Sequence, residues 1–562
     1  MEVENVPTFS SRKGVSVEIN SQRSNPLGVT NHQQEEQQEA PTPLWLQWAS
    51  QRSSFKVFPT SNDDIGNSII DRSLSRPSSH FCDLNIDQED EEELDVNQGH
   101  VIDQNDRDDL EKQNQEVLEP PKITHPKKTK SRLSVILLDQ GLFTIYKRLF
   151  MLSLVLNITA LVLAATGHFM YARNRATLFS IGNILALTLC RCEAFLRIVF
   201  WLAVNLFGRS WVPLKMKTST TSFLQSLGGI HSGCGVSSIG WLVYAIVLTL
   251  KDRANTSNEI IAVAAAIFVL LCLSSLAAFP LVRHLHHNVF ERTHRFAGWS
   301  ALLLLWAFII LKIGYNPKTK SYNNLKASNL MKTQEFWFTA VITAIIILPW
   351  LTVRRVAVKI THNSTHASVI KFEGNGVKAG ILGRISPSPL SEWHAFGIIS
   401  DGEKDHMMLA GAVGDFTKSL VSNPPSHLWV RKVHFAGLPY LMNMYERVQM
   451  VATGSGICVF LSFLMQRSRA EVRVLWVAKG VEENYGREIK EAVYSGVAAG
   501  KVVVYDSGLR GGRPNVGKMS VEEAKRWGAQ VVVVTSNPEG SRDVVRACEN
   551  AGIPAFGPIW DS

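Results

Sequence analysis

The chain has 562 residues, of which 46% are hydrophobic, and its formal net charge is +9. Much of the positive charge lies in loops beside apolar stretches and forms no basic stripe interleaved with aromatic residues, which excludes a nucleic-acid-binding protein. The seven cysteines form neither a CxxC pair nor a disulfide framework, so a secreted disulfide-rich protein is excluded and a reducing cytosolic environment is expected for the soluble parts.

Residues 1–135 are polar and are predicted to form a disordered cytosolic tail, because such a composition buries too little apolar area to offset the entropy of ordering. Acidic residues run without a break from Glu89 to Glu93, and we expect this tail to be available to protein partners. A basic cluster from Lys127 to Arg132 then precedes the apolar region. By the positive-inside rule this cluster predicts a cytosolic N-terminus.

Residues 136–352 are predicted to form a membrane domain of about six spans in a lipid bilayer, since about 20 apolar residues cross the hydrocarbon. An even number of crossings returns the C-terminus to the cytosol. The expected spans are Phe150–Tyr171, Leu178–Phe207, Ile230–Leu250, Ile260–Val282, Phe296–Leu311 and Phe336–Leu351.

After Leu351 the pattern changes to that of a soluble α/β module. Short strands punctuated by glycine and proline predict a small β-barrel over residues 353–445, and strand–helix alternation over 446–562 predicts a parallel-sheet lobe of the nucleotide-binding type. The expected barrel strands are Val356–Ile360, Ala367–Phe372, Ala379–Ile385 and Phe396–Ser400. The expected lobe strands are Val448–Ala452, Val472–Val477, Val502–Tyr505 and Val531–Thr535, separated by helices Glu482–Ser495, Val521–Trp527 and Asp543–Ala551.

Three ionisable residues fall inside the second expected span and need an explanation, because charge within a bilayer is costly. Glu193 and Arg197 are four residues apart and can form an ion pair on one helix face. Arg191 is then available to bind a carboxylate of a buried cofactor. Pairing of Arg191 with backbone carbonyls or lipid headgroups is the alternative.

Two histidines stand at the cytosolic ends of the third and fifth spans, at similar depth. His231 lies in a glycine-rich segment from Gly228 to Gly235, which would let a bulky planar group approach the backbone. His294 lies two residues before Phe296, where the fifth expected span begins. Neutral imidazoles on two facing helices can clamp one haem iron. The alternative is that each histidine is an interfacial polar anchor.

The strongest soluble motif is Thr453-Gly454-Ser455-Gly456, which follows a buried strand and opens into a helix over Val459–Leu464. Glycines permit a tight turn, and backbone amides at a helix start favour a phosphate group. The motif predicts a pyridine-nucleotide site, and the alternative is an ordinary strand-to-helix turn in a vestigial lobe.

In this order, these residues resemble the ferric reductase and NADPH oxidase superfamily, over roughly residues 140–562. The similar branch is a divergent one that includes the fungal integral membrane protein TmpA and membrane proteins related to adenylate-forming reductases. The resemblance implies a haem b domain joined to a ferredoxin–NADP reductase-like module that binds FAD and NADPH, and it implies a location in the plasma membrane. The segment Glu392-Trp393-His394-Ala395-Phe396-Gly397 is similar to the flavin motif, and Gly414-Asp415-Phe416-Thr417 to the motif that follows it.

By resemblance, the cofactor-binding residues are His394, Phe396, Ser400, Thr417 and the loop Thr453–Gly456, with Arg191 near haem and Trp560 over flavin. The sequence also departs from the family. The second histidine, 13 or 14 positions after the first, is replaced by Tyr244 or Ala245 after His231, and by Ala307 or Phe308 after His294. At most one inner haem, with His231 and His294 as metal ligands, is therefore expected.

Two functions follow from the sequence. The first is a membrane oxidoreductase that passes electrons from NADPH to FAD and then to one inner haem, with an unknown acceptor. The second is a catalytically degenerate relative that serves signalling or scaffolding in growth or development. The altered flavin motif, with Ala395 and Gly397, favours the second; the Thr453–Gly456 loop with Arg191, His231 and His294 favours the first.

Overall fold

The computed structural model describes residues 144–279, 282–283, 286–323, 325–374, 376–494 and 500–558. The predicted acidic tail and Trp560 lie outside these residues.

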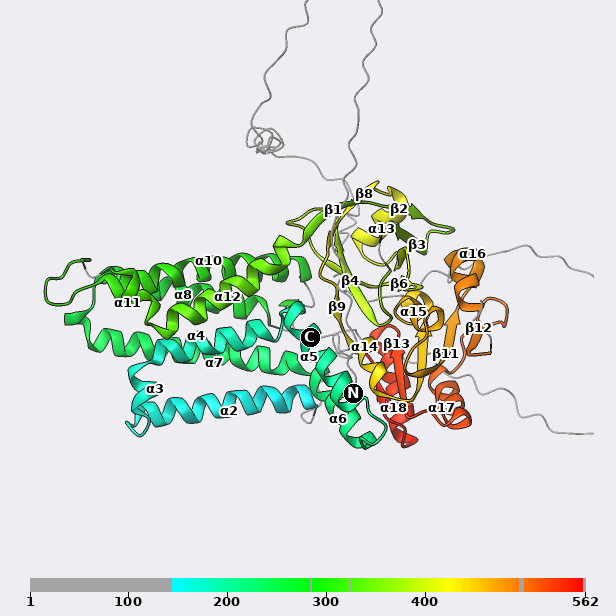
Figure 1. The fold of residues 1–562 in the computed structure, drawn as a ribbon, viewed down its shortest axis with the longest axis horizontal. Helices are drawn as coiled ribbons and strands as arrows, with labels where there is room; N and C mark the ends of the chain where they lie inside the picture. Colours follow the sequence, from blue (N-terminus) through cyan, green and yellow to red (C-terminus); the bar gives the residue numbers. More distant parts are fainter. Residues whose placement is uncertain are drawn as a thin grey trace, which may run out of the picture. The chain divides into compact units, whose positions relative to one another are not determined.

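A bundle of apolar helices forms the first half of the described chain. Five helices within the described ranges are long and apolar enough to cross a membrane, and α4, with 14 residues, is shorter. The bundle consists of α2 (Ile145–Ala165), α4 (Ala176–Leu189), α7 (Leu227–Lys251), α8 (Asn258–Ala277), α10 (His287–Gly314) and α12 (Gln334–Leu351), which lie alongside one another (Figure 1). The short helices α3 (Met170–Asn174), η1 (Arg253–Asn255) and α11 (Ala327–Met331) lie in the connections α2–α4, α7–α8 and α10–α12.

The exterior of this bundle is apolar. Leu156 on α2 and Val269 on α8 each expose 61% of their surface, and Leu303 on α10 exposes 72%. Water disfavours apolar surface of this extent, whereas lipid accepts it. The structure is therefore consistent with a membrane protein.

The second expected span, Leu178–Phe207, is wrong as a single helix. The chain leaves the helical conformation between α4 and α5 (Glu193–Phe207), where Cys192 is extended with ψ 106°. Helix α5 turns away from the bundle and packs against the soluble module, and α6 (Leu214–Gln225) follows it there. The charged residues after Leu189 explain the break, since the bundle interior offers no water to solvate them.

Two antiparallel sheets make the barrel-like part of the module. One sheet has the order β1-β8-β4-β5, with β9 beside β4, and the other has the order β2-β3-β7-β6. Their strands are β1 (Val353–Ala357), β2 (Lys359–Thr361), β3 (Ala367–Phe372), β4 (Ile381–Ser386), β5 (His394–Gly397), β6 (Ile399–Ser400), β7 (His406–Gly411), β8 (His427–Arg431) and β9 (Phe435–Ala436). Short helices follow at α13 (Asp415–Ser422), α14 (Leu438–Leu441) and η2 (Met442–Met444).

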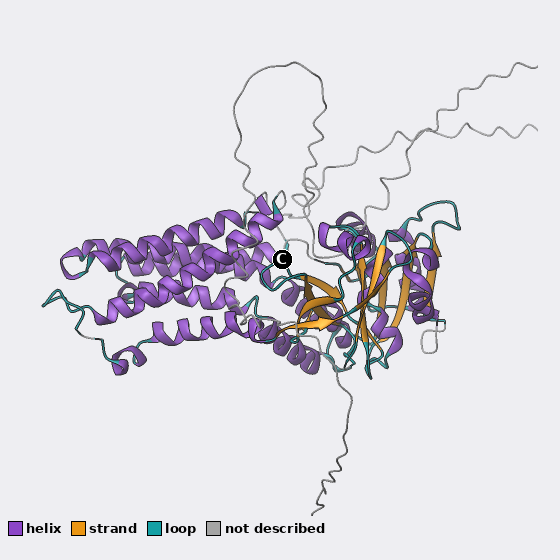
Figure 2. Cartoon of the chain, turned by 90° about the horizontal axis from the view of Figure 1, so that it is seen from above, coloured by secondary structure: helices purple, strands orange, loops and turns teal. Residues whose placement is uncertain are grey.

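The C-terminal lobe is a five-stranded parallel sheet of order β12-β11-β10-β13-β14, with helices on its faces (Figure 2). Its strands are β10 (Arg447–Thr453), β11 (Glu471–Ala478), β12 (Val502–Asp506), β13 (Val531–Thr535) and β14 (Ala555–Phe556). Its helical segments are η3 (Gly454–Val459), α15 (Leu461–Met465), α16 (Val481–Tyr494), α17 (Val516–Trp527) and α18 (Pro538–Asn550). The predicted parallel sheet is thus confirmed, and because β10 and β13 are neighbours, the strand order reverses between them.

Candidate functional site: a histidine pair beside the α/β module

The two predicted metal ligands face each other. His231 on α7 and His294 on α10 have ring centroids 6.4 Å apart, with an angle of 55° between the ring planes. Two imidazole–metal bonds of about 2 Å each, together with the distance from each ligating nitrogen to its ring centre, add up to roughly 6 Å. The spacing therefore suits one metal ion held between the two rings.

Hydrogen bonds fix which nitrogen of each ring can bind a metal. His231 Nδ1 donates to the Leu187 carbonyl on α4 at 3.0 Å. His294 Nδ1 contacts the Ser274 hydroxyl on α8 at 2.8 Å and donates to the Ser274 carbonyl at 3.2 Å. A carbonyl only accepts, so both Nδ1 atoms carry the proton and both Nε2 lone pairs are available to a metal ion. Histidines that bind a metal usually donate their other ring N–H to a carbonyl or carboxylate in this way.

The glycines near the histidines have two different roles. A Cβ on Gly229 would lie 2.2 Å from the Tyr146 carbonyl oxygen, and one on Gly233 would lie 2.8 Å from Ser153 Cβ, so these glycines let α2 approach α7. The expectation that the whole segment admits a planar group is therefore wrong for them. Gly235, one turn above His231, and Gly298, one turn above His294, have nothing within 4 Å of a Cβ. The backbone is therefore unobstructed at these two glycines, one turn from each imidazole.

Arg191 lies in the break after α4, close enough to both imidazoles to act on them electrostatically; the residue keeps accessible surface although protein atoms surround it on many sides. The predicted pair of Glu193 with Arg197 is wrong. Glu193 pairs with Arg384 on β4 and, at 3.6 Å, with Arg431 on β8. Arg197 instead donates to the His434 carbonyl at 3.2 Å. Both residues therefore connect α5 to the barrel.

Apolar packing occupies the positions of a second haem. Phe308 and Ala245 are buried, and Tyr244 packs edge-on against the fully buried Trp241. Phe308 belongs to a cluster with Leu242 and Ile342. Over the described ranges, no group of three or more His, Cys, Asp or Glu side chains could hold a metal ion.

The expected flavin residues are brought together on the barrel, but two of them already serve the fold. His394 is buried and stacks on Phe416, with ring centroids 4.5 Å apart and planes 15° apart. The Ser400 hydroxyl accepts from the Val377 and Gly402 amides, and it donates to the Asp405 carbonyl. The expectation that this hydroxyl serves a cofactor is therefore not supported.

Thr417, like Ser400, uses its hydroxyl to hold its own loop. Its hydroxyl accepts from the Val413 and Gly414 amides at 3.1 and 3.0 Å, and it caps α13. Phe396 is half-buried and packs on the core that the barrel and lobe share. Of the four barrel residues, only His394 and Phe396 present aromatic rings that a flavin could contact.

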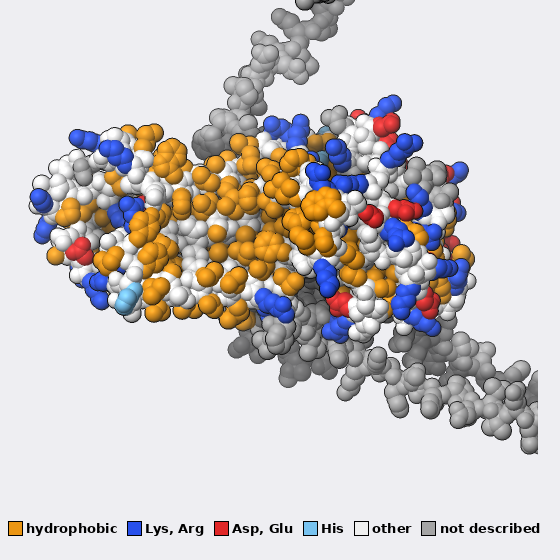
Figure 3. Space-filling view, turned by 60° about the horizontal axis from the view of Figure 1, so that its bottom comes forward, with side chains coloured by type: hydrophobic (Ala, Val, Ile, Leu, Met, Phe, Trp, Pro, Cys, Tyr) orange, Lys and Arg blue, Asp and Glu red, His pale blue; other side chains and the backbone are white. Residues whose placement is uncertain are grey.

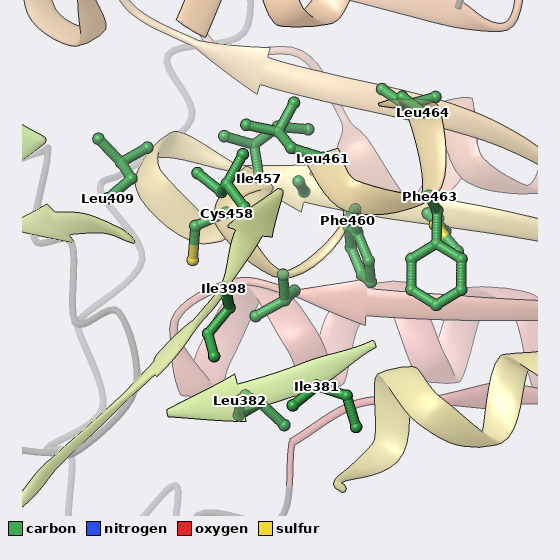
Figure 4. Close-up of a cluster of buried hydrophobic side chains, with 14 of the residues drawn as sticks. Ile381, Leu382, Ile398, Leu409, Ile457, Cys458, Phe460, Leu461, Phe463 and Leu464 are labelled. Carbon is green, nitrogen blue, oxygen red and sulfur yellow. The ribbon is translucent and has the colours of Figure 1, made fainter. Parts of the chain in front are cut away.

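A closed seam joins the barrel to the lobe. A Cβ on Gly397 would lie 2.7 Å from Val459 Cα, and one on Gly411 would lie 2.7 Å from the Ser455 hydroxyl. Figure 4 shows side chains from β4 and β7 gathered with those from η3 and α15 in one cluster. A flat ring needs about 3.5 Å on each face, so a flavin does not fit between Gly397 and Val459 as they stand.

The Thr453–Gly456 loop lies at the strand-order reversal, where doubly wound sheets bind their ligands. Gly454, Ser455 and Gly456 are nonetheless buried, and the Thr453 hydroxyl bonds to the Ser536 hydroxyl at 2.7 Å. The loop itself forms the 3-10 helix η3, and the expected helix over Val459–Leu464 is present as α15, which begins two residues later than expected. The loop is in the right place for a dinucleotide, but its surface is covered.

Sequence reasoning missed the contact between α10 and the loop before β5. Arg292 pairs with Glu392 at 3.0 Å, and Arg295 donates to the carbonyls of Leu390 and Ser391. These arginines flank His294 on its own helix, so the helix that carries a candidate ligand also holds the barrel. In the sequence, the only sign of this contact is the pair of arginines, Arg292 and Arg295, just before the fifth expected span.

The C-terminal domain of adenylate-forming reductase 03009 matches residues 438–562 as a family model. Adenylate-forming reductases 03009 and 06235 of Coprinopsis cinerea are 35% and 33% identical over 443 and 444 residues, which is 78% of this chain and 42% of each relative. Among solved structures, a ferredoxin–NADP+ reductase from Plasmodium falciparum aligns with 37% of the chain and 95% of its own at a TM-score of 0.29 and 10% identity. The chain is thus similar to two fungal adenylate-forming reductases, of whose length it spans less than half.

Proposed function

We propose that this chain is a membrane-embedded redox protein that holds a single haem b between His231 and His294. The paired imidazoles carry the proposal, because their 6.4 Å spacing and their Nδ1 hydrogen bonds leave two Nε2 atoms for one iron. When bound, a haem with two imidazole ligands supplies one-electron chemistry. Arg191 is suited to pair with a haem carboxylate, and Gly235 and Gly298 leave space for the ring.

The absence of histidine at the outer positions favours electron transfer on one side of the membrane. Ala245 and Phe308 pack in the apolar interior of the described bundle, so the proposed carrier has one site at the module end. We therefore propose an acceptor in the membrane or on the module side, and not on the far side. Cytosolic termini, a plasma-membrane location and membership of the ferric reductase and NADPH oxidase superfamily belong to the same proposal, as do the domain limits 135, 352 and 445.

FAD and NADPH are proposed only for an opened form of the module. The contacts of Gly397 with Val459 and of Gly411 with Ser455 would have to separate before a flavin or a nicotinamide could enter. His394 and Phe396 would then face a flavin, and Thr453–Gly456 would face a dinucleotide phosphate.

The second candidate function is a non-catalytic signalling or scaffold protein, in which the module has kept the fold and lost its cofactors. The closed seam favours this function. The two candidates differ in haem: a scaffold needs none, whereas the redox protein loses its activity without it.

An absorption spectrum of the full-length protein purified in detergent tests the proposal. We expect a Soret band that disappears in His231→Ala and in His294→Ala and persists in His168→Ala, whose histidine lies at the far end of the bundle. Flavin released on denaturation, measured by fluorescence, reports separately on the module. A folded protein without a Soret band would refute the redox proposal and leave the scaffold.

A further inference from the structure

Helix α5 is apolar on two opposite faces. On one face Phe200, Ala203 and Val204 are buried in the core of the module. On the other face Ile198 exposes 63% of its surface, and Trp201 and Leu202 expose 55% and 47%. An amphipathic helix on a water-soluble module needs only the first apolar face, so the second requires an apolar partner.

We propose that α5 lies in the plane of the membrane surface, with its exposed face inserted at the boundary between lipid headgroups and acyl chains. The helix then connects two apolar environments, the core of the module and the bilayer. Helices that lie in the interface combine an inserted apolar face with tryptophan and flanking basic residues. This inference rests on the bundle spanning a bilayer, as proposed above, and it does not depend on haem.

The connection to α4 supports this placement. Three residues, Cys190 to Cys192, separate α4 from α5, so α5 begins at the end of a bundle helix and cannot be far from the membrane surface. Figure 3 shows hydrophobic side chains that cover the bundle and continue toward its module end. Trp211, just after α5, exposes 75% of its surface. Tryptophan is enriched at the level of the headgroups.

The polar groups around this face are compatible with lipid. The Asn205 amide donates to the Trp201 carbonyl within the helix at 3.0 Å, which satisfies one of its N–H groups, and the headgroup level offers water to the rest of the amide. Arg197 reaches back to the module through the His434 carbonyl. Arg209 and Lys215 are exposed beyond the end of α5, where anionic headgroups would attract them.

Photo-crosslinking of the full-length protein in nanodiscs of phosphatidylcholine and phosphatidylserine tests the inference. p-Benzoylphenylalanine replaces Ile198 or Leu202 on α5, Val269 on the exterior of α8, or Leu509, which is 86% exposed on the lobe. Mass spectrometry identifies the adducts. We expect lipid adducts at positions 198 and 202 in yields similar to that at 269 and several-fold above that at 509.

Each other result overturns the inference. Peptide adducts at 198 and 202 in place of lipid adducts would assign the face to a second copy of the chain. Lipid adducts at 269 alone would show that α5 lies clear of the bilayer while the bundle spans it. The absence of lipid adducts at 269 as well would remove the membrane premise itself.

Discussion

The two candidate ligands differ in the number of hydrogen bonds that hold their imidazoles. His231 is held by one carbonyl, whereas His294 is held by both the hydroxyl and the carbonyl of Ser274. Ser274→Ala removes one of the two contacts and leaves the carbonyl to keep Nδ1 protonated. Loss of an outer-shell partner weakens metal binding by about 10–100-fold.

We therefore expect Ser274→Ala to keep the Soret band but to release haem more readily, measured by transfer of haem to apomyoglobin. Ser237→Ala on α7 is the control, since the Ser237 hydroxyl makes no hydrogen bond to any of the described residues. Equal haem loss from Ser274→Ala and the wild-type protein would assign no positioning role to Ser274.

The sequence identified the histidine pair but not its supports. His231 and His294 could be predicted because each stands at the same end of an apolar span. Ser274 and Leu187 could not, since nothing in the sequence shows which turn of α8 or α4 faces a given imidazole. Ser400 and Thr417 show a related difficulty: a hydroxyl that caps its own loop and one that binds a cofactor have the same sequence signature.

At the scale of elements, hydropathy predicted most of the helices and failed at one. It measures whether a residue avoids water and does not distinguish lipid from a protein core. The residues Phe200 and Val204 extend the apolar run of α4, yet they pack in the module. The charges at Arg191 and Glu193 were the local signal of the break. Strands β3 and β13 match their predicted limits because every residue of β13 and all but Lys371 of β3 are buried, whereas β7, which contains two methionines, was missed.

Glu193, at the start of α5, joins this helix to the barrel. Removal of the Glu193 charge should therefore weaken the contact between α5 and the barrel. The Glu193 side chain is 13% exposed and faces Arg384 and Arg431. In Glu193→Gln two half-buried guanidinium groups lose their counter-charge, which costs about 1–3 kcal/mol. We expect a lower apparent melting temperature of the detergent-solubilised protein.

Glu491→Gln is the matched control for this change. Glu491 pairs with Arg487 at 2.7 Å, but their side chains are 60% and 81% exposed, so solvent screening makes the pair nearly neutral in energy. A melting temperature for Glu193→Gln as high as that of the control would mean that packing alone holds α5.

At the scale of the whole molecule, the free energy of unfolding should decrease in acid because His434 is buried as a neutral ring. Burial, together with the nearby His406 and Arg197, lowers the pKa of His434 from 6.5 to about 4. The folded state therefore keeps the ring neutral while the unfolded chain protonates below pH 6.5. The resulting stability is complete above pH 6.5 and is lost as the pH falls toward 4, by at most about 3 kcal/mol.

His434→Gln should flatten this dependence of the apparent melting temperature between pH 6.5 and 4. His427→Gln removes an exposed histidine from β8 and should leave the dependence unchanged. An identical acid profile for His434→Gln and the wild-type protein would exclude His434 as the responsible group.

Arg295 joins the helix bundle to the soluble module. Its guanidinium donates to two carbonyls of the loop before β5 and pairs with Glu291 one turn earlier on α10. A lysine keeps the charge but cannot reproduce the planar fork, in which Nη1 donates to the two carbonyls while Nη2 pairs with Glu291. In Arg295→Lys the loop from Leu390 to Trp393 should exchange its amide hydrogens faster, while His294, on the same helix, should keep its spectroscopic signature.

Arg355→Lys on β1, where the side chain is exposed, should change neither property. Because the loop leads directly into His394, its release would also loosen the stack of His394 on Phe416 and the seam beside Gly397. Addition of FAD should then give more bound flavin in Arg295→Lys than in the wild-type protein, if docking on α10 keeps the seam closed. Faster exchange without a gain in flavin would mean that the barrel and lobe hold the seam closed by themselves.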